Sequence, residues 1–169
     1  MNLILIGMPG AGKSTVGVIL AKLTSRDFVD TDLLIQTSQR RTLQDIVDTD
    51  GYIALREVEG DVLQRLAVRN CVIATGGSAV YSECAMEHLK AGGRAVFLDV
   101  DIATLEARIH NFRTRGLAKR ADQDFAEMFL ERYALYMKYA DIVVNCVGLT
   151  QEEVCARIME QVEVKPSGT

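Results

Sequence analysis

A glycine-rich stretch near the start of the chain, GMPGAGKST at residues 7–15, has the residue types of a phosphate-binding loop. It matches the pattern G-x-x-x-x-G-K-[ST] at Gly7, Gly12, Lys13 and Ser14. Glycines let successive backbone N–H groups point at phosphate oxygens, and a following helix adds its positive N-terminus. A lysine there binds the β and γ phosphates, and the serine hydroxyl is a typical Mg²⁺ ligand. The stretch therefore predicts ATP binding by Gly10, Ala11, Gly12, Lys13, Ser14 and Thr15, with Lys13 also catalytic.

The setting of this loop supports the prediction. The apolar run LILI at 3–6 precedes it, and an apolar helical pattern at 13–23 follows it, which is the strand–loop–helix order that a P-loop requires. GTP-binding proteins also carry such a loop, but they need an N-K-x-D stretch after a later strand. Here the strand-like DIVV is followed by NCVGL, at 145–149, so guanine specificity is disfavoured.

Two aspartates one residue apart, Asp30 and Asp32 in the stretch VDTD, form a second candidate feature. Residues i and i+2 of an extended chain point to the same side, so we expect both carboxylates to face one place. Anions this close repel each other and require a positive partner. Mg²⁺ with bound ATP would supply that charge.

The composition is typical of a single soluble globular domain: 169 residues, 49% hydrophobic and 25% charged. The net charge of −4 argues against a nucleic-acid surface, and no apolar run approaches the ~20 residues of a membrane span. The start, MNLILIG, predicts a first strand and not a signal peptide. The four cysteines share no metal-like spacing, so we expect reduced cysteines in a cytoplasmic protein, with Cys71 and Cys146 in the core.

Short apolar runs alternate with longer amphipathic stretches along the chain. This alternation predicts an α/β domain of P-loop kinase type, a three-layer α/β/α arrangement around a parallel sheet of about five strands. We expect one domain over 1–163 and a tail over 164–169. The expected strands are 3–6, a run ending at 28–29, 71–75, 94–100 and 141–144. The expected helices are 13–23, 31–38, 42–69 with a break at Gly51, 81–90, 102–111, 123–139 and 150–163, the last with a capping box from Thr150 to Glu153.

Three further polar features follow in the sequence. LREVEG places Arg56 and Glu59 on one helical face, where a surface ion pair is the simpler interpretation. TGGSAV places Gly76 and Gly77 at the carboxyl edge of the predicted sheet, where ligands bind in such folds, although an ordinary turn also fits. ERYALYMKYAD carries Arg132 in a helix, where a lone arginine is usually solvated.

Taken together, these stretches resemble the shikimate kinase family, in the family's order and at close to its spacing. The resemblance covers nearly the whole chain and rests on GMPGAGKST, VDTDLLI, DGYIALREVEG, ATGGSAV and ERYALYMKYADIVV. It implies transfer of the ATP γ-phosphate, with Mg²⁺, to a hydroxyl of shikimate. The product would be shikimate 3-phosphate, in aromatic amino acid biosynthesis, and the resemblance suggests a monomer.

The resemblance also implies roles for individual residues. It places Asp30 on the metal with Ser14, and Asp32 on the acceptor hydroxyl as the candidate base. An acceptor-binding helical region would span 31–62. Arginine is suited to bidentate carboxylate recognition, which agrees with the implied role of Arg56 and Arg132. The remaining assignments are acceptor contacts from Gly76, Gly77 and Ser78, and Glu59 as the residue that orients Arg56.

The basic stretch FRTRGLAKRAD corresponds to the family's lid, expected over 111–123. Arg115 would close over the phosphates and stabilise the transferring charge, and Arg108 would lie on the adenine side. A solvated charge run is the alternative, because the nearby Arg113, Lys119 and Arg120 have no assigned role.

Three positions depart from the family pattern. Gly116 replaces the lid proline, Ser78 replaces a third glycine, and Leu55 replaces the aromatic residue before Arg56. All three lie on the acceptor side or its lid, while the ATP side is intact, so the sequence supports the class of P-loop small-molecule kinase more strongly than it supports shikimate as the acceptor. A kinase for a related polyhydroxy acid such as gluconate is one alternative. A nucleotide-binding regulatory module without transfer activity is another.

Overall fold

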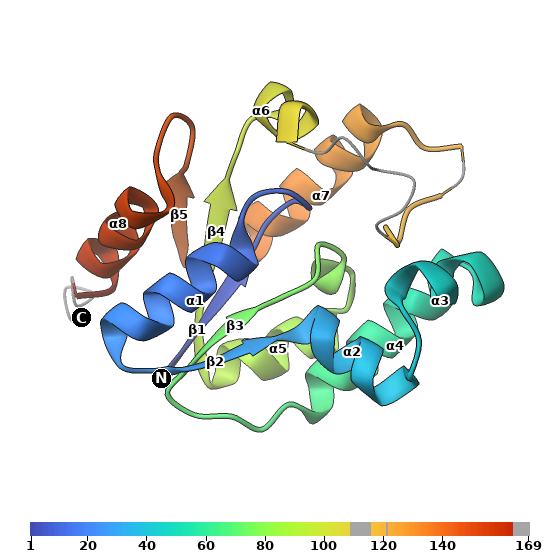
Figure 1. The fold of residues 1–169 in the computed structure, drawn as a ribbon, viewed down its shortest axis with the longest axis horizontal. Coiled ribbons are helices and arrows are strands. Elements are labelled where there is room, and N and C mark those ends of the chain that lie inside the picture. The colour runs from blue at the N-terminus through green and yellow to red at the C-terminus, as the bar shows by residue number, and fades with distance from the viewer. Residues whose placement is uncertain (109–115, 121, 164–169) are drawn as a thin grey trace.

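The computed structural model describes residues 1–108, 116–120 and 122–163, which form an α/β/α arrangement (Figure 1). The central sheet has five parallel strands in the order β2-β3-β1-β4-β5, which confirms the predicted fold class. The strands are β1 (Asn2–Ile6), β2 (Asp27–Asp30), β3 (Cys71–Ala74), β4 (Gly93–Asp99) and β5 (Ile142–Asn145).

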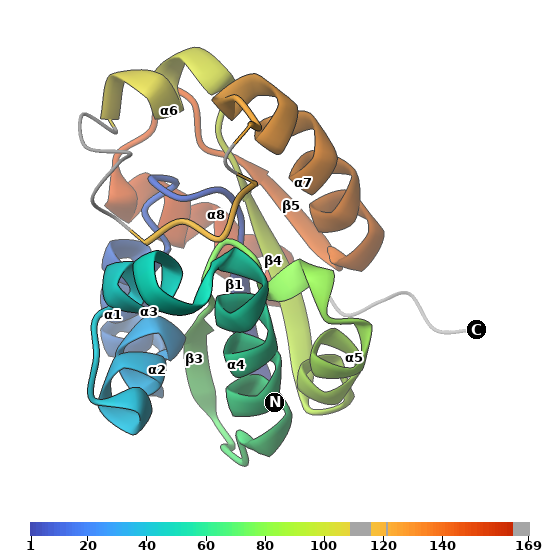
Figure 2. The same ribbon diagram turned by 90° about the vertical axis from the view of Figure 1, so that its right-hand side faces the viewer.

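Helices cover both faces of this sheet because its inner strands are apolar on both sides. Every residue of β1 and β3 is buried, whereas the edge strand β5 alternates buried and exposed residues. In Figure 1, α1 (Lys13–Thr24) crosses in front of the sheet beside α8 (Gln151–Glu163). Behind the sheet lie α5 (Glu83–Ala91) and α7 (Phe125–Tyr139), as the second view also shows (Figure 2).

Three consecutive helices project beside β2 and form a helical lobe: α2 (Thr31–Gln39), α3 (Leu43–Asp50) and α4 (Tyr52–Arg65). The predicted break at Gly51 is confirmed, since its φ of +90° lies in the region that favours glycine and separates α3 from α4. The lobe has a small core of its own, in which Ile35, Ile46 and Leu55 pack with Ala118. Ala118 belongs to the segment 116–120, which passes over α3 and α4 (Figure 2).

Several predicted helix boundaries were wrong by a few residues. The helix expected to run to residue 69 ends at Arg65, because residues 66–70 leave the helix to enter β3. A 3₁₀ turn, η1 (Ala79–Tyr81), precedes α5, which Ser82 caps by accepting from the Ala85 N–H. The element α6 (Ile102–Arg108) is followed by residues outside the described part of the chain.

The last two helices begin at side-chain caps. At α7, Asp124 and Glu127 form a reciprocal capping box that fixes the start at Phe125, two residues later than expected. At α8 the predicted box is confirmed, because the Thr150 N–H donates to Glu153 and the Glu153 N–H donates back to the Thr150 hydroxyl.

The cysteines follow the prediction for the core. Cys71 and Cys146 are buried, and all four cysteines are free thiols. Within the ranges that the structure describes, no helix combines the length and the apolar character that crossing a membrane would take.

Gly93, the first residue of β4, packs closely against β1, whereas its neighbour Gly92 does not. A Cβ at Gly93 would lie 2.6 Å from the Asn2 carbonyl oxygen, which the strand pairing holds in place. We expect Gly93→Ala to lower the free energy of unfolding by about 1–3 kcal/mol, because overpacking against backbone cannot relax. Gly92→Ala is the matched control, since its Cβ would find its nearest neighbour at 3.7 Å. Urea denaturation of both variants measures the difference, and equal stabilities would contradict the expectation.

Candidate active site

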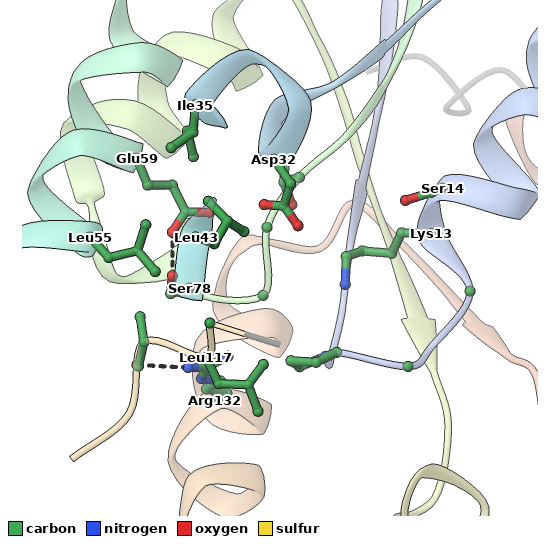
Figure 3. A pocket seen from close by; sticks show the side chains of 18 of the residues that line it. Lys13, Ser14, Asp32, Ile35, Leu43, Leu55, Glu59, Ser78, Leu117 and Arg132 are labelled. Atoms are coloured by element: carbon green, nitrogen blue, oxygen red, sulfur yellow. Dashed lines mark hydrogen bonds between the residues drawn. The ribbon is translucent and has the colours of Figure 1, made fainter. Parts of the chain in front are cut away.

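A cavity of about 330 Å³ opens at the carboxyl edge of the sheet, between the phosphate-binding loop, the helical lobe and residues 116–118 (Figure 3). Most of the residues predicted from the sequence meet in its wall. They are Gly10, Gly12, Lys13, Ser14, Thr15, Asp32, Glu59, Gly76, Gly77, Ser78, Arg108 and Arg132. The predicted Ala11, Asp30 and Arg56 lie outside this lining, and Arg115 and Arg113 lie outside the described residues.

The glycine-rich loop wraps around the side chain of Lys13. The loop ends at Gly12, whose φ of +94° starts α1 from a left-handed conformation. The buried Lys13 ammonium donates to the carbonyl oxygens of Gly7 at 2.7 Å and Met8 at 2.9 Å. Burial lowers the pKa of Lys13 to about 8, and the nearby Asp32 carboxylate opposes that shift. The ammonium is thus held inside the loop at the point where phosphate oxygens would bind.

The two aspartates of VDTD do not share one extended segment. β2 ends at Asp30 and α2 begins at Thr31, so Asp32 lies in the first turn of a helix and the expected parallel orientation was wrong. Asp30 caps that helix by accepting from the Asp32 N–H at 3.0 Å, and its other oxygen accepts from the Ser14 hydroxyl at 2.6 Å. Asp32 instead turns its carboxylate into the cavity, between Lys13 and Glu59 (Figure 3).

The turn after β3 brings its backbone against these acids. A Cβ at Gly76 would lie 2.2 Å from Glu59 Oε1 and 2.7 Å from Asp32 Oδ1, so a side chain there would force both carboxylates to move. The same geometry puts the two carboxyl oxygens within about 5 Å of each other, close enough for mutual repulsion. The Gly76 N–H donates to the buried Thr31 hydroxyl at 3.1 Å, which ties the turn to α2.

Glu59 is a buried acid with an altered ionisation. Its side chain is 3% exposed and accepts a hydrogen bond from the Ser78 hydroxyl. Burial raises the pKa of Glu59 to about 7, and the Asp32 charge adds to that shift, while Ser78 and the cations Arg132 and Lys13 oppose it. The hydroxyl that replaces the family's third glycine is therefore bound to Glu59.

Two arginines from different helices converge on one backbone oxygen. Arg56 of α4 and Arg132 of α7 donate to the Ala118 carbonyl, at 3.1 Å and 2.9 Å. Arg132 is 1% exposed, and the neighbouring Gly77 is close to it, because a Cβ at Gly77 would lie 2.9 Å from its NH1. A carbonyl oxygen that attracts two guanidinium groups marks a place suited to an anion.

The other basic residues take different positions. The exposed Arg108 reaches the phosphate-binding loop, where it donates to the Gly10 carbonyl at 3.5 Å. Lys119 donates to the Gln123 carbonyl at 2.8 Å, and the exposed Arg120 lies 3.8 Å from Asp122. Neither of these two side chains lines the cavity.

Sequence reasoning missed the aromatic surroundings of Arg56. Its guanidinium carbon lies 3.5 Å from the ring centroid of Tyr81 and 5.1 Å from that of Tyr52. Tyr136 likewise has an unpredicted contact, since its hydroxyl donates to the Gly77 carbonyl at 2.6 Å. Tyr52 lies one helical turn before Arg56, a spacing that could have been noticed. Tyr81 comes from a distant part of the chain, and no sequence signal links it to Arg56.

A parallel sheet with this loop at the end of β1, and a cavity that joins the loop to two buried or inward-facing acids and to Arg132, are the features of a P-loop kinase for small molecules. The chain belongs to the shikimate kinase family, whose sequence profile matches residues 9–163. The shikimate kinase of Rippkaea orientalis is 36% identical, over 98% of this chain and 91% of that protein. The members of this family are kinases that phosphorylate a hydroxyl group.

Solved structures of the family superpose closely on the fold. The shikimate kinase from Acinetobacter baumannii in complex with shikimate has a TM-score of 0.85 and 28% identity, over 97% of this chain and 95% of that one. The enzyme from Aquifex aeolicus has a TM-score of 0.83 and 33% identity, over 96% of both chains.

The buried Glu59 gives a pH-dependent stability. Its pKa is raised from 4.5 to about 7, so between these pH values folding takes up a proton. This contribution to stability is fully present below pH 4.5 and is lost as the pH rises through 7. Glu59→Gln mimics the protonated form, so we expect its melting temperature to rise relative to wild type between pH 4.5 and pH 8.

Thermal melts of both proteins across this range measure the effect. The control is Glu57→Gln, an exposed acid on the same helix, for which we expect no such trend. A constant difference between Glu59→Gln and wild type at every pH would contradict the assignment.

Proposed function

We propose that this protein is a shikimate kinase, which transfers the γ-phosphoryl group of ATP to a hydroxyl of shikimate and yields shikimate 3-phosphate for aromatic amino acid biosynthesis. The observation that carries the proposal is the single cavity that joins Lys13, Asp32 and Arg132. The binding of shikimate by the related A. baumannii enzyme supports the choice of acceptor. ADP release in a coupled assay with shikimate, gluconate and nucleoside monophosphates tests it, and we expect turnover with shikimate alone.

The acceptor carboxylate would bind at the two arginines. Arg56 and Arg132 approach one oxygen from different elements, which is the arrangement that holds a carboxylate at a fixed angle. The Ala118 carbonyl now accepts from both, and a carboxylate oxygen is the stronger acceptor for these donors. Gly76, Gly77 and Ser78 would contact the hydroxyl side of the acceptor, since they line the same wall.

Asp32 would act as the base. Its carboxylate points into the cavity between Lys13 and the acceptor wall, where the hydroxyl to be phosphorylated must lie. As the hydroxyl oxygen bonds to the γ-phosphorus, its proton passes to Asp32, and the bond from the γ-phosphorus to the bridging oxygen breaks to release ADP. Lys13 would leave its loop carbonyls to donate to the phosphate oxygens and stabilise their charge.

Ser14 and Asp30 would hold Mg²⁺. Their oxygens are 2.6 Å apart beside the loop, and both are hard oxygen donors of the kind that Mg²⁺ selects. Mg²⁺ usually keeps several waters and takes substrate phosphate oxygens, so two protein ligands would be enough for such a site. Bound there, Mg²⁺ neutralises phosphate charge.

The remaining ATP contacts follow from position and from the family. Arg108 is assigned to the adenine side, because its guanidinium lies over the Gly10 carbonyl at the open end of the loop. Arg115 is assigned to the phosphates as the lid arginine, on the resemblance alone. We further propose a cytoplasmic monomer: the four cysteines share no metal-like spacing, which favours reduced thiols, and the family resemblance suggests a monomer.

Replacement of the proposed base tests the mechanism. We expect Asp32→Asn to lower kcat by about 10²–10⁴-fold, because the amide cannot accept the proton, while ATP binding is kept. Steady-state kinetics and nucleotide binding measure the two effects. Asp61→Asn, an exposed acid on α4, is the control with normal turnover expected. Near-normal turnover of Asp32→Asn would remove this residue from the mechanism.

A conservative change tests the carboxylate site. We expect Arg132→Lys to raise the apparent KM for shikimate by roughly tenfold or more, because lysine keeps the charge but loses the planar fork. The KM for ATP should stay within about twofold of wild type. Arg65→Lys, at the exposed end of α4, is the matched control. Equal effects on both KM values would place Arg132 elsewhere in the reaction.

A further inference from the structure

The ring of Tyr81 lies under the guanidinium of Arg56, on an element that the P-loop chemistry does not use. We propose that Tyr81 is a positioning residue of the acceptor site, whose ring holds Arg56 ready for the carboxylate without neutralising its charge. The inference rests on the proposed function, since it concerns how the arginine of that same site is presented.

The geometry is that of a cation–π contact. The guanidinium carbon of Arg56 is 3.5 Å from the Tyr81 ring centroid, well inside the ~6 Å range of this interaction. The guanidinium carbon of Arg132 is 5.6 Å from the same centroid, so one ring lies within reach of both cations. Tyr52 flanks Arg56 at 5.1 Å and makes the weaker of its two ring contacts.

The ring takes the place that a carboxylate would ordinarily fill. In the ranges that the structure describes, neither Arg56 nor Arg132 forms an ion pair within 4.0 Å. Glu59, one helical turn after Arg56, accepts instead from Ser78. A π-face attracts a cation through its quadrupole but carries no net charge, so the ring does not neutralise Arg56, and the Glu131 carboxylate acts on Arg56 only from beyond ion-pair distance. An acidic partner would oppose the binding of an acceptor carboxylate.

Arg56 and Arg132 each have an Nε–H group that could donate a hydrogen bond to a ligand. Their Nε atoms are buried and have no hydrogen-bond partner among the described residues. Each arginine donates one hydrogen bond to the Ala118 carbonyl, and Arg132 also interacts with the hydroxyls of Tyr81 and Tyr136. Buried, unpartnered N–H groups are costly, so an acceptor carboxylate that bound them would relieve that cost.

The hydroxyl of Tyr81 is hydrogen-bonded to α7. The Tyr81 hydroxyl donates to one carboxyl oxygen of Glu131 on α7, and the other oxygen accepts from Gln123 Nε2 at 2.9 Å. Gln123 is 3% exposed and lies in the segment that carries Ala118 to α7. The hydroxyl thus links the ring to α7, while the contact with Arg56 is made by the face of the ring itself.

Steady-state kinetics with shikimate and ATP test the proposal on three variants. We expect Tyr81→Leu to raise the apparent KM for shikimate by roughly tenfold, with kcat and the KM for ATP within about twofold of wild type. Tyr81→Phe keeps the ring and should stay within about threefold of wild type in every parameter. Tyr52→Leu removes the more distant ring and should have a smaller effect than Tyr81→Leu.

A double-mutant cycle separates positioning from general structural damage. If Tyr81 acts through Arg56, Tyr81→Leu should change the KM for shikimate by less than about twofold when Arg56→Ala is already present. A merely structural role would instead give additive losses and would lower kcat and ATP affinity as well. Should Tyr81→Leu fail to fold, Tyr81→Met offers similar size without a π-face and takes its place in the cycle.

The outcomes separate this inference from the proposed function. A wild-type protein that does not turn over shikimate overturns both. Turnover by wild type together with an unchanged KM in Tyr81→Leu, or with additive effects in the cycle, overturns the positioning role alone. An equal loss in Tyr81→Phe and Tyr81→Leu would assign the effect to the hydroxyl bond with Glu131 and would also overturn it.

Discussion

Charge balance inside one cavity is the constraint on which the rest of the structure depends. Lys13, Glu59 and Arg132 are buried there, and Asp32 turns its carboxylate toward them. Removing such groups from water is expensive unless each finds a partner. The protein meets this cost with backbone carbonyls for Lys13 and Arg132, a serine hydroxyl for Glu59, and a raised pKa that favours the neutral form of that acid.

Glycine at two positions makes this crowding possible. A Cβ at Gly76 would crowd Glu59 and Asp32, and a Cβ at Gly77 would crowd Arg132, so the turn after β3 lies close to both acids and to the cation. Tyr136 holds that turn by donating to the Gly77 carbonyl. The departures from the family pattern fit the same scheme. Ser78 is paired with Glu59, and the rings near Arg56 come from Tyr52 and Tyr81 rather than from the residue at position 55.

A glycine also joins the segment 116–120 to the helical lobe. Gly116, with φ of +62°, accepts no side chain, because a Cβ would lie 2.5 Å from the Gln44 nitrogen, and its N–H donates to Gln44 Oε1 at 2.7 Å. Ala118 packs into the lobe core and offers its carbonyl to the arginines. The segment and the lobe thus share one core, so a movement of the segment would displace the carbonyl to which Arg56 and Arg132 donate.

The sequence by itself determined the succession of strands and helices along the chain and the position of the phosphate loop. Nearly continuous apolar runs mark strands that are buried on both faces, and G-x-x-x-x-G-K-S marks the loop. Both signals depend only on residues that are neighbours in the sequence. The sequence also identified Asp30, Asp32, Arg56 and Arg132 as candidates, though their assigned roles remain proposals. Only the tertiary structure decided their partners. Whether Glu59 pairs with Arg56 or with Ser78, and whether a ring from position 81 lies under Arg56, depends on contacts between distant segments. Local periodicity carries no information about such contacts.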